Sequence, residues 1–185
     1  MNRASSMLKS AVLIAAAFAV GCLSALALRA YDARHERITP ISGGQTIDFS
    51  EYGFFLTVPE GYSLADYTTN NHAEGGNAVF AGCAFDENGS ELYIFCYDNE
   101  SGDAIADYGE QELVSYYTHA GADDVRLRTL GGRRFICYSA MVETQDGAQT
   151  WYTMETWDSA HQVTFETRMA PESALPILAT IDFDI

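Results

Sequence analysis

The sequence predicts an α+β domain in which an antiparallel sheet of about six to eight strands carries helices packed on it, preceded by one N-terminal apolar helix. Three observations lead to this fold class. Segment 161–169 alternates apolar and polar side chains, which is the pattern of a strand with one buried face. Hairpin turns at Asn88-Gly89 and Asp146-Gly147 each join two extended segments. Segments 107–120 and 171–179 have the apolar spacing and end signals of helices instead.

The chain is strongly acidic, and its charge is unevenly distributed. Its 185 residues contain 26 Asp and Glu against 10 Lys and Arg, a formal charge of -16. Residues 41–185 hold 24 of the acids, five arginines and no lysine, so this part carries -19. Binding to nucleic acid or to anionic lipid needs clustered cations, which argues against both for this part. A hydrophobic fraction of 48% is too high for a disordered acidic chain and predicts a folded domain.

Three segments precede the globular part, 46–185. The tail 1–10 is polar and basic, and 11–28 is an uncharged apolar stretch of 18 residues. At about 1.5 Å per residue this stretch spans roughly 27 Å, enough for the hydrocarbon core of a bilayer. We expect it to be an uncleaved signal anchor, a single-pass transmembrane helix in the cell membrane with the domain outside the cytoplasm. Segment 29–45 is then a juxtamembrane tether.

Two alternatives for the apolar stretch remain open. Ala25-Leu26-Ala27 has the small-residue pattern of a signal-peptide cleavage site, and cleavage there would release a secreted domain. Cys22 follows Ala19-Val20-Gly21 in a pattern similar to a bacterial lipoprotein box, and lipidation of Cys22 would leave a lipid-anchored domain. All three interpretations place the domain outside the cytoplasm.

Two hairpins open the globular part. We expect the first to consist of 46–49 and 52–58, and the second of 78–86 and 91–98, with its turn at Asn88-Gly89.

A meander of three further strands follows, at 135–144, 149–157 and 161–169. In the last of these strands, Val163 and Phe165 lie on the buried face. With Asp146-Gly147 as a two-residue turn, Met141 lies opposite Tyr152 and Ser139 opposite Met154. The other face of the first two strands carries Ile136, Tyr138, Val142, Trp151 and Trp157. This face is too apolar to meet only water, so we expect it to be covered.

Two helices are candidates for the cover. Segment 107–120 has acidic residues in its early part and stops at Gly121, as helices commonly do. Segment 171–179 begins at a proline, and we expect a last strand at 180–185 to follow it.

Three short motifs mark the order of these elements. Val58-Pro59-Glu60-Gly61-Tyr62 ends the opening strand, Leu130-Gly131-Gly132-Arg133 precedes the meander, and Ala179-Thr180-Ile181-Asp182-Phe183 follows the last helix. This order resembles the PsbP-like fold, which bacteria use in many small anchored extracytoplasmic proteins. Such proteins serve as binding or assembly modules more often than as enzymes, so the resemblance implies a module of this kind over 46–185 and transfers no catalytic residue.

Four of the five arginines of the globular part lie in one nine-residue stretch, at Arg126, Arg128, Arg133 and Arg134. The planar guanidinium group can bind a carboxylate or phosphate at two points. A turn at Gly131-Gly132 would bring the ends of two short strands together. We therefore expect residues 126–134 to form one compact edge that recognises an acidic protein or an anionic surface. The alternative is that these arginines neutralise nearby carboxylates in a solvated network.

Cys83 and Cys96 are candidates for a disulfide. In the expected second hairpin, Cys83 lies opposite Ile94 and Cys96 lies diagonally on the same side, so a bond would need a two-residue slip or a bulge. The alternative is that Cys83, Cys96 and Cys137 are small buried apolar residues.

No spacing in the sequence indicates a catalytic or metal centre. His72 with Glu74, and His119 with Asp123, lack the three or four regularly spaced ligands of zinc sites. A nucleophile elbow and a phosphate-binding glycine loop are also missing from the sequence. We therefore expect a membrane-tethered, monomeric binding or assembly module without a cofactor. The alternative is a surface hydrolase or metal-assisted enzyme with an unrecognised site.

Overall fold

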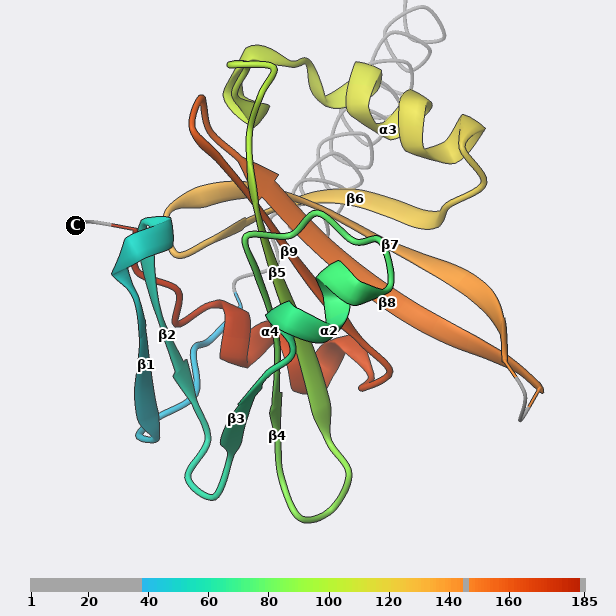
Figure 1. Cartoon of the computed structure of the whole chain (residues 1–185). Helices are drawn as coiled ribbons and strands as arrows, with labels where there is room; N and C mark the ends of the chain where they lie inside the picture. Colours follow the sequence, from blue (N-terminus) through green and yellow to red (C-terminus); the bar gives the residue numbers. More distant parts are fainter. Residues whose placement is uncertain (1–37, 145–146, 184–185) are drawn as a thin grey trace, which may run out of the picture. The chain divides into compact units, whose positions relative to one another are not determined.

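The computed structural model describes residues 38–144 and 147–183 (Figure 1). The tail 1–10, the apolar stretch 11–28 with Cys22, and most of the tether lie outside these residues. Among the described residues, no helix is both long and apolar enough to cross a membrane.

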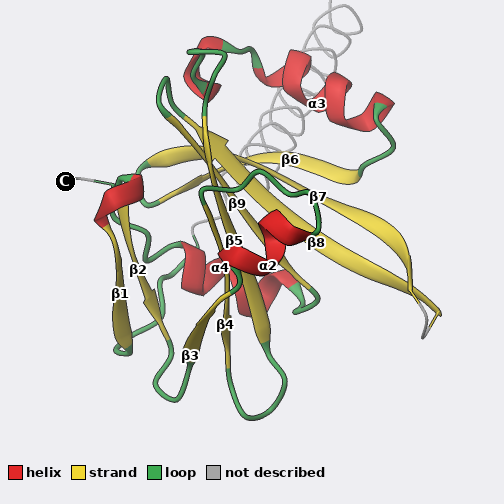
Figure 2. Ribbon diagram, viewed as in Figure 1, coloured by secondary structure: helices red, strands yellow, loops and turns green. Residues whose placement is uncertain are grey.

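A large antiparallel sheet forms the centre of the domain (Figures 1 and 2). In the part of the chain that the structure describes, it has seven strands in the order β3-β4-β5-β9-β8-β7-β6. In that order, the strands are Ser63–Asp66, Phe80–Phe85, Glu91–Asp98, His161–Thr167, Gly147–Trp157, Arg133–Thr144 and Asp123–Leu130. The sheet confirms the expected antiparallel α+β architecture, with β3 as a strand that the sequence did not indicate.

The opening hairpin forms a separate two-stranded sheet, β1 (Gln45–Phe49) with β2 (Phe54–Val58), joined by the short 3-10 helix η1 (Ser50–Tyr52). This hairpin and α4 (Pro171–Leu178) bury one face of the large sheet. On the opposite face lie the 3-10 helix η2 (Ile105–Asp107) and α3 (Glu110–His119). The short α2 (Thr68–Ala73) follows β3; Figure 1 shows it in front of the strands, with α4 behind them.

The main core lies between the large sheet, the β1–β2 hairpin and α4. Phe165 of β9 is fully buried there, and its ring centroid lies 6.1 Å from that of Phe54 and 6.3 Å from that of Phe135. Val163 is buried on the same face. The expected alternation of β9 is therefore confirmed, because period-two spacing sends Phe165 and Val163 to one side of the sheet.

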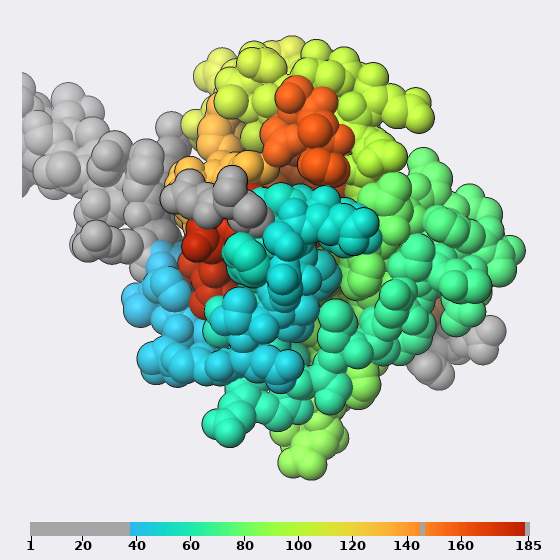
Figure 3. Space-filling model, turned by 60° about the vertical axis from the view of Figure 1, so that its left-hand side comes forward, coloured from blue at the N-terminus to red at the C-terminus, as the bar shows by residue number. Residues whose placement is uncertain are grey.

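The chain after α4 closes the main core. Instead of a strand over 180–185, the described residues make one isolated bridge, in which Phe55 and Asp182 exchange backbone hydrogen bonds of 2.8 and 3.0 Å. The hydroxyl of Thr180 also accepts a hydrogen bond of 3.0 Å from the backbone N–H of Thr57. Figure 3 shows the C-terminal segment, in red, beside the blue and cyan N-terminal part of the domain.

The Leu-Gly-Gly-Arg motif is the two-residue turn between β6 and β7, as expected, since Leu130 pairs with Arg133. Both glycines have positive φ, +53° at Gly131 and +76° at Gly132, which favours glycine. Gly131 has a second constraint: a Cβ there would lie 1.9 Å from the carbonyl oxygen of Ile181. The turn is thus packed directly against the C-terminal segment.

The register of the β7–β8 hairpin differs by two residues from the expected one. Ser139 lies opposite Tyr152 rather than Met154, and Met141 opposite Thr150 rather than Tyr152. The expected turn, Asp146-Gly147, is wrong because Gly147 already pairs with Thr144. An even shift keeps every side chain on its expected face, and η2 and α3 cover part of the apolar face, over Ile136 and Tyr138.

We predict that Gly131→Ala destabilises the domain far more than Gly132→Ala. Gly132→Ala adds a Cβ in open space and should lower the free energy of unfolding by about 1–2 kcal/mol, because of the left-handed backbone alone. Gly131→Ala also forces the turn away from Ile181 and should lower it by about 4 kcal/mol or more. Chemical denaturation of the two variants measures the difference, and equal losses of unfolding free energy would contradict the close approach.

Candidate functional site

The sheet face opposite the main core is covered only in part. η2 and α3 pack over Ile136 with Ile105 and Leu113, and the loop after α2 contributes Asn77 from the other side. Between them, the central strands line a hollow of about 710 Å³, which is within the usual size range of small-molecule sites. We call it the acidic hollow.

The acidic hollow is lined by carboxylates, phenols, amides and hydroxyls. Its described lining residues are Asp98, Glu100, Glu155, Glu166, Tyr97, Tyr138, Asn77, Asn99, Gln162, Ser101 and Thr164. None of these carries a positive charge. The hollow therefore combines negative charge with aromatic rings.

The strand pattern and register bring these side chains together. Gln162, Thr164 and Glu166 alternate with the core residues of β9, so they point to the hollow's side. Thr164 lies opposite Glu155 of β8, which places Glu155 and Glu166 at diagonal positions on neighbouring strands.

Glu155 is the most buried carboxylate of the hollow, with 6% of its surface exposed. The hydroxyl of Tyr117, from α3, donates a hydrogen bond to it. Burial, followed by repulsion from Glu166, raises the pKa of Glu155 to about 7. Burial also raises the pKa of Glu166. Near neutral pH the Glu155 carboxyl group is therefore only partly ionised.

The phenols of the hollow stay protonated at neutral pH. Burial raises the pKa of Tyr97 and of Tyr138 above the ordinary value of tyrosine. The ring of Tyr138 lies 5.0 Å from that of Tyr117, and the ring of Tyr97 stacks on Phe95 at 6.4 Å. These contacts hold the two phenol rings in place around the carboxylates.

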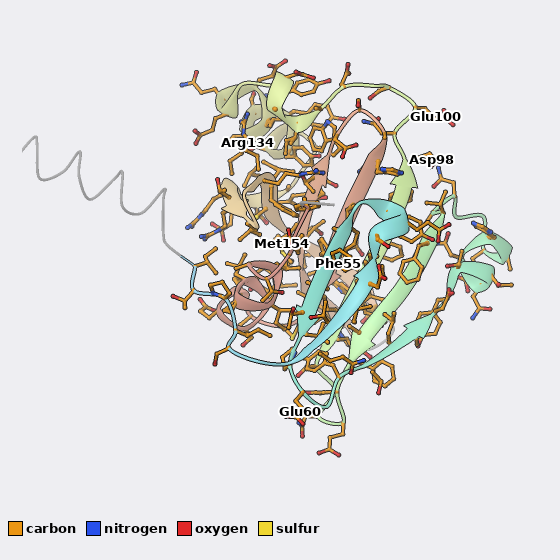
Figure 4. All side chains as sticks on the ribbon, turned by 90° about the vertical axis from the view of Figure 1, so that its left-hand side faces the viewer. Phe55, Glu60, Asp98, Glu100, Arg134 and Met154 are labelled. Atoms are coloured by element: carbon orange, nitrogen blue, oxygen red, sulfur yellow. The ribbon has the colours of Figure 1, made fainter. Side chains whose placement is uncertain are left out.

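Two exposed acids lie at the mouth of the hollow, at the end of β5. Figure 4 shows Asp98 and Glu100 close together there, with Arg134 set apart from them. The loop that carries Glu100 is fixed by Asn99, whose side-chain amide donates to the carbonyl of Asp103 at 2.7 Å and also to the carbonyl of Asp158.

The four arginines expected to form one edge are divided between the two faces of the sheet. Arg126 and Arg128 pair with Cys137 and Phe135, residues of the main core, so they lie on that side. Arg126 is 3.8 Å from Asp124, and both side chains are exposed.

The other two arginines contact the fold itself. Arg133 forms an ion pair of 2.9 Å with Asp158, and its guanidinium group lies 3.9 Å from the centre of the Phe183 ring. Arg134 points to the opposite face and donates to the carbonyl of Tyr108 at 3.2 Å. A binding role for the arginines stays a prediction, and only three of them share a face.

The candidate disulfide is not formed, and Cys83, Cys96 and Cys137 are free, buried thiols. Cys83 lies opposite Tyr93 rather than Ile94, so the expected register is wrong by one residue. Such a shift reverses faces: Cys96 is in the main core and Cys83 is on the other side. Burial raises the pKa of Cys83 to about 11 and that of Cys96 to about 12, which leaves both thiols unreactive.

We predict that the domain loses stability as the pH rises from 5 to 8. Because Glu155 holds its proton more tightly when folded, its contribution is complete below about pH 4.5 and disappears as the pH rises through 7. The loss should be of the order of 3 kcal/mol. Glu155→Gln should flatten the dependence, and the matched surface change Glu172→Gln should not. Urea unfolding at several pH values tests this, and identical profiles for all three proteins would refute the assignment.

Comparison with known proteins supports the fold. The solution structure of cyanobacterial PsbP (CyanoP) from Synechocystis sp. PCC 6803 matches 76% of this chain and 92% of its own, at 15% identity and a TM-score of 0.52. A crystal structure from Bacteroides thetaiotaomicron VPI-5482 matches 76% of this chain and 48% of its own, at 11% identity and a TM-score of 0.47. No family model and no curated protein matches the sequence. The likeness to the cyanobacterial protein concerns the fold, and the globular part of this chain accordingly has a PsbP-like fold.

Proposed function

We propose that this protein is a non-catalytic binding module, tethered outside the cytoplasm by 11–28, and that it holds its ligand in the acidic hollow. The observation that carries the proposal is the Glu155–Glu166 pair in the middle of the sheet. Two neighbouring carboxyl groups with little access to water lower the stability of the fold. Such groups, gathered with perturbed pKa values in a concave site, are typical of binding and catalytic centres.

The position of Glu155 supports a functional rather than a structural role. Its cross-strand neighbour Ile136 is fully buried under η2 and α3. An apolar residue at 155 would extend this small core and remove the desolvation cost of a carboxylate. Retention of a destabilising group beside a hollow is the pattern expected where function and stability conflict.

The acidic hollow is a better candidate than the arginine stretch. Arg133 is held by Asp158 and Phe183, and Arg134 by the Tyr108 carbonyl. These contacts give both side chains a role within the domain.

The tether is tested by fractionation and by surface proteolysis. Full-length protein should sediment with membranes, and protease applied to intact cells should remove the domain while a cytoplasmic marker survives. Protection of the domain under these conditions would contradict the proposed orientation.

The site is tested by mapping small probes on the full-length protein in non-ionic micelles. NMR shifts are recorded with butylammonium, butyrate and glucose, one probe of each charge class. We expect at least one probe to shift the amides of Tyr97 and Gln162, and Gln162→Phe, which fills the hollow, to abolish the effect. Gln45→Phe on the exposed strand β1 is the control and should change nothing. Shifts confined to 126–134, or none at all, would refute the site.

A further inference from the structure

We propose that the ligand of the acidic hollow is an organic cation, an ammonium or guanidinium group held between the carboxylates of Glu155 and Glu166 and the phenol rings of Tyr97 and Tyr138. This inference rests on the proposed function, because it names the chemical class bound at the same site.

Charge is the first argument. Four of the lining residues are acidic and, among its described members, none is basic. Asp98 and Glu100 at the mouth are exposed, while Glu155 and Glu166 lie deeper in the sheet. In a domain with a formal charge of -19 over 41–185, the field around this opening attracts cations and repels anions. A cation that enters the hollow would supply a countercharge to the carboxylates of Glu155 and Glu166.

The aromatic rings make the second argument, and they distinguish an organic cation from a simple one. A cation within about 6 Å of an aromatic face is stabilised by the ring quadrupole, most strongly where water is excluded. Tyr97 and Tyr138 flank the carboxylates from β5 and β7. Their rings also offer apolar surface to the carbon atoms of an alkylammonium or alkylguanidinium ion.

The arrangement suits a bulky cation better than a bare metal ion. Calcium takes six to eight oxygen ligands at 2.3–2.6 Å. Within 38–144 and 147–183, no three His, Cys, Asp or Glu side chains converge as a metal-binding group. The 710 Å³ of the hollow instead leaves room for a group of several carbon atoms.

Binding of a cation here should be linked to protons. The ionisable groups on the face of Glu155 are Glu166 from β9, Tyr138 and Arg134 from β7, Tyr97 from β5 and Tyr117 from α3, with Asp98 and Glu100 at the mouth. Burial holds the pKa values of Tyr97 and Tyr138 above the ordinary value of tyrosine, so these two phenols stay neutral near pH 7. Glu155, with its pKa raised to about 7, changes charge between pH 5 and 8, and a bound cation favours its ionised form.

The test uses the full-length protein in non-ionic micelles, titrated by NMR. Butylammonium and butylguanidinium are compared with butanol, the neutral isostere of butylammonium, with butyrate and with calcium chloride. We expect both organic cations to shift the amides of Tyr97 and Gln162, and to bind at least tenfold more tightly at pH 8 than at pH 5. A tripeptide with blocked termini and one central lysine separates two sources of the same group: tighter binding than butylammonium indicates a protein side chain, and weaker binding a free amine.

The variants separate charge from shape. Glu155→Gln and Glu166→Gln keep the size of the side chain and should each weaken cation binding at least tenfold at pH 8. Glu155→Gln should also remove the pH dependence. Glu172→Gln, on the exposed side of α4, is the matched control and should bind as the original protein does. Because the two changes remove buried charge, the variants are expected to fold at least as stably, which denaturation verifies.

The outcomes also separate this inference from the proposed function. Binding of butanol or butyrate in the hollow as tightly as butylammonium would refute the cation and leave the site in place. Tight binding of calcium with no effect of the organic cations would also refute the organic cation. Absence of every probe from the hollow would refute both proposals.

Discussion

The aromatic contact of Phe165 with Phe54 and Phe135 determines how most of this domain is arranged. It joins β9, at the middle of the large sheet, to the opening hairpin and to β7, three segments that are far apart in the sequence. Because Phe165 and Val163 face the main core, the two-residue period of a strand places Thr164 and Glu166 on the opposite face of the sheet. The chemistry of the acidic hollow is thus a direct consequence of the packing on the opposite face.

Local patterns in the sequence predicted most of the strands and the two longer helices. The alternation at 161–169 predicted β9, and the glycines at 131–132 predicted the turn between β6 and β7. Both predictions succeeded because each pattern reflects a rigid requirement of the backbone. The two-residue turn expected at Asn88-Gly89 failed for a local reason. The side chain of Asp86 accepts backbone hydrogen bonds of 2.9 Å from both Asn88 and Ser90, which produces a longer loop and shifts the register by one. β3 and α2 were missed because they are short, largely exposed and lack a periodic apolar pattern.

The candidate site was much less visible in the sequence than the fold. The arginine stretch is conspicuous because four like charges fall within nine residues, yet strand geometry divides them between two faces. Glu155 is inconspicuous because Trp151 and Trp157 surround it on an apolar face, and Glu166 reads as an ordinary solvent-facing position. Only the register of β8 with β9 shows that the two carboxylates are neighbours. An acidic residue on the strand face that carries Trp151 and Trp157 was the one local signal that could have indicated the hollow.

The close approach of Gly131 to Ile181, with the Phe55–Asp182 bridge, has a consequence for synthesis. The opening hairpin and the β6–β7 turn both obtain partners from residues 181 and 182. β5 also lacks its neighbour in the sheet until β9 has been made. A growing chain therefore keeps apolar surface of the earlier segments exposed until 161–182 has left the ribosome, and such contacts between distant segments form slowly. The main core can close only after this late segment has emerged.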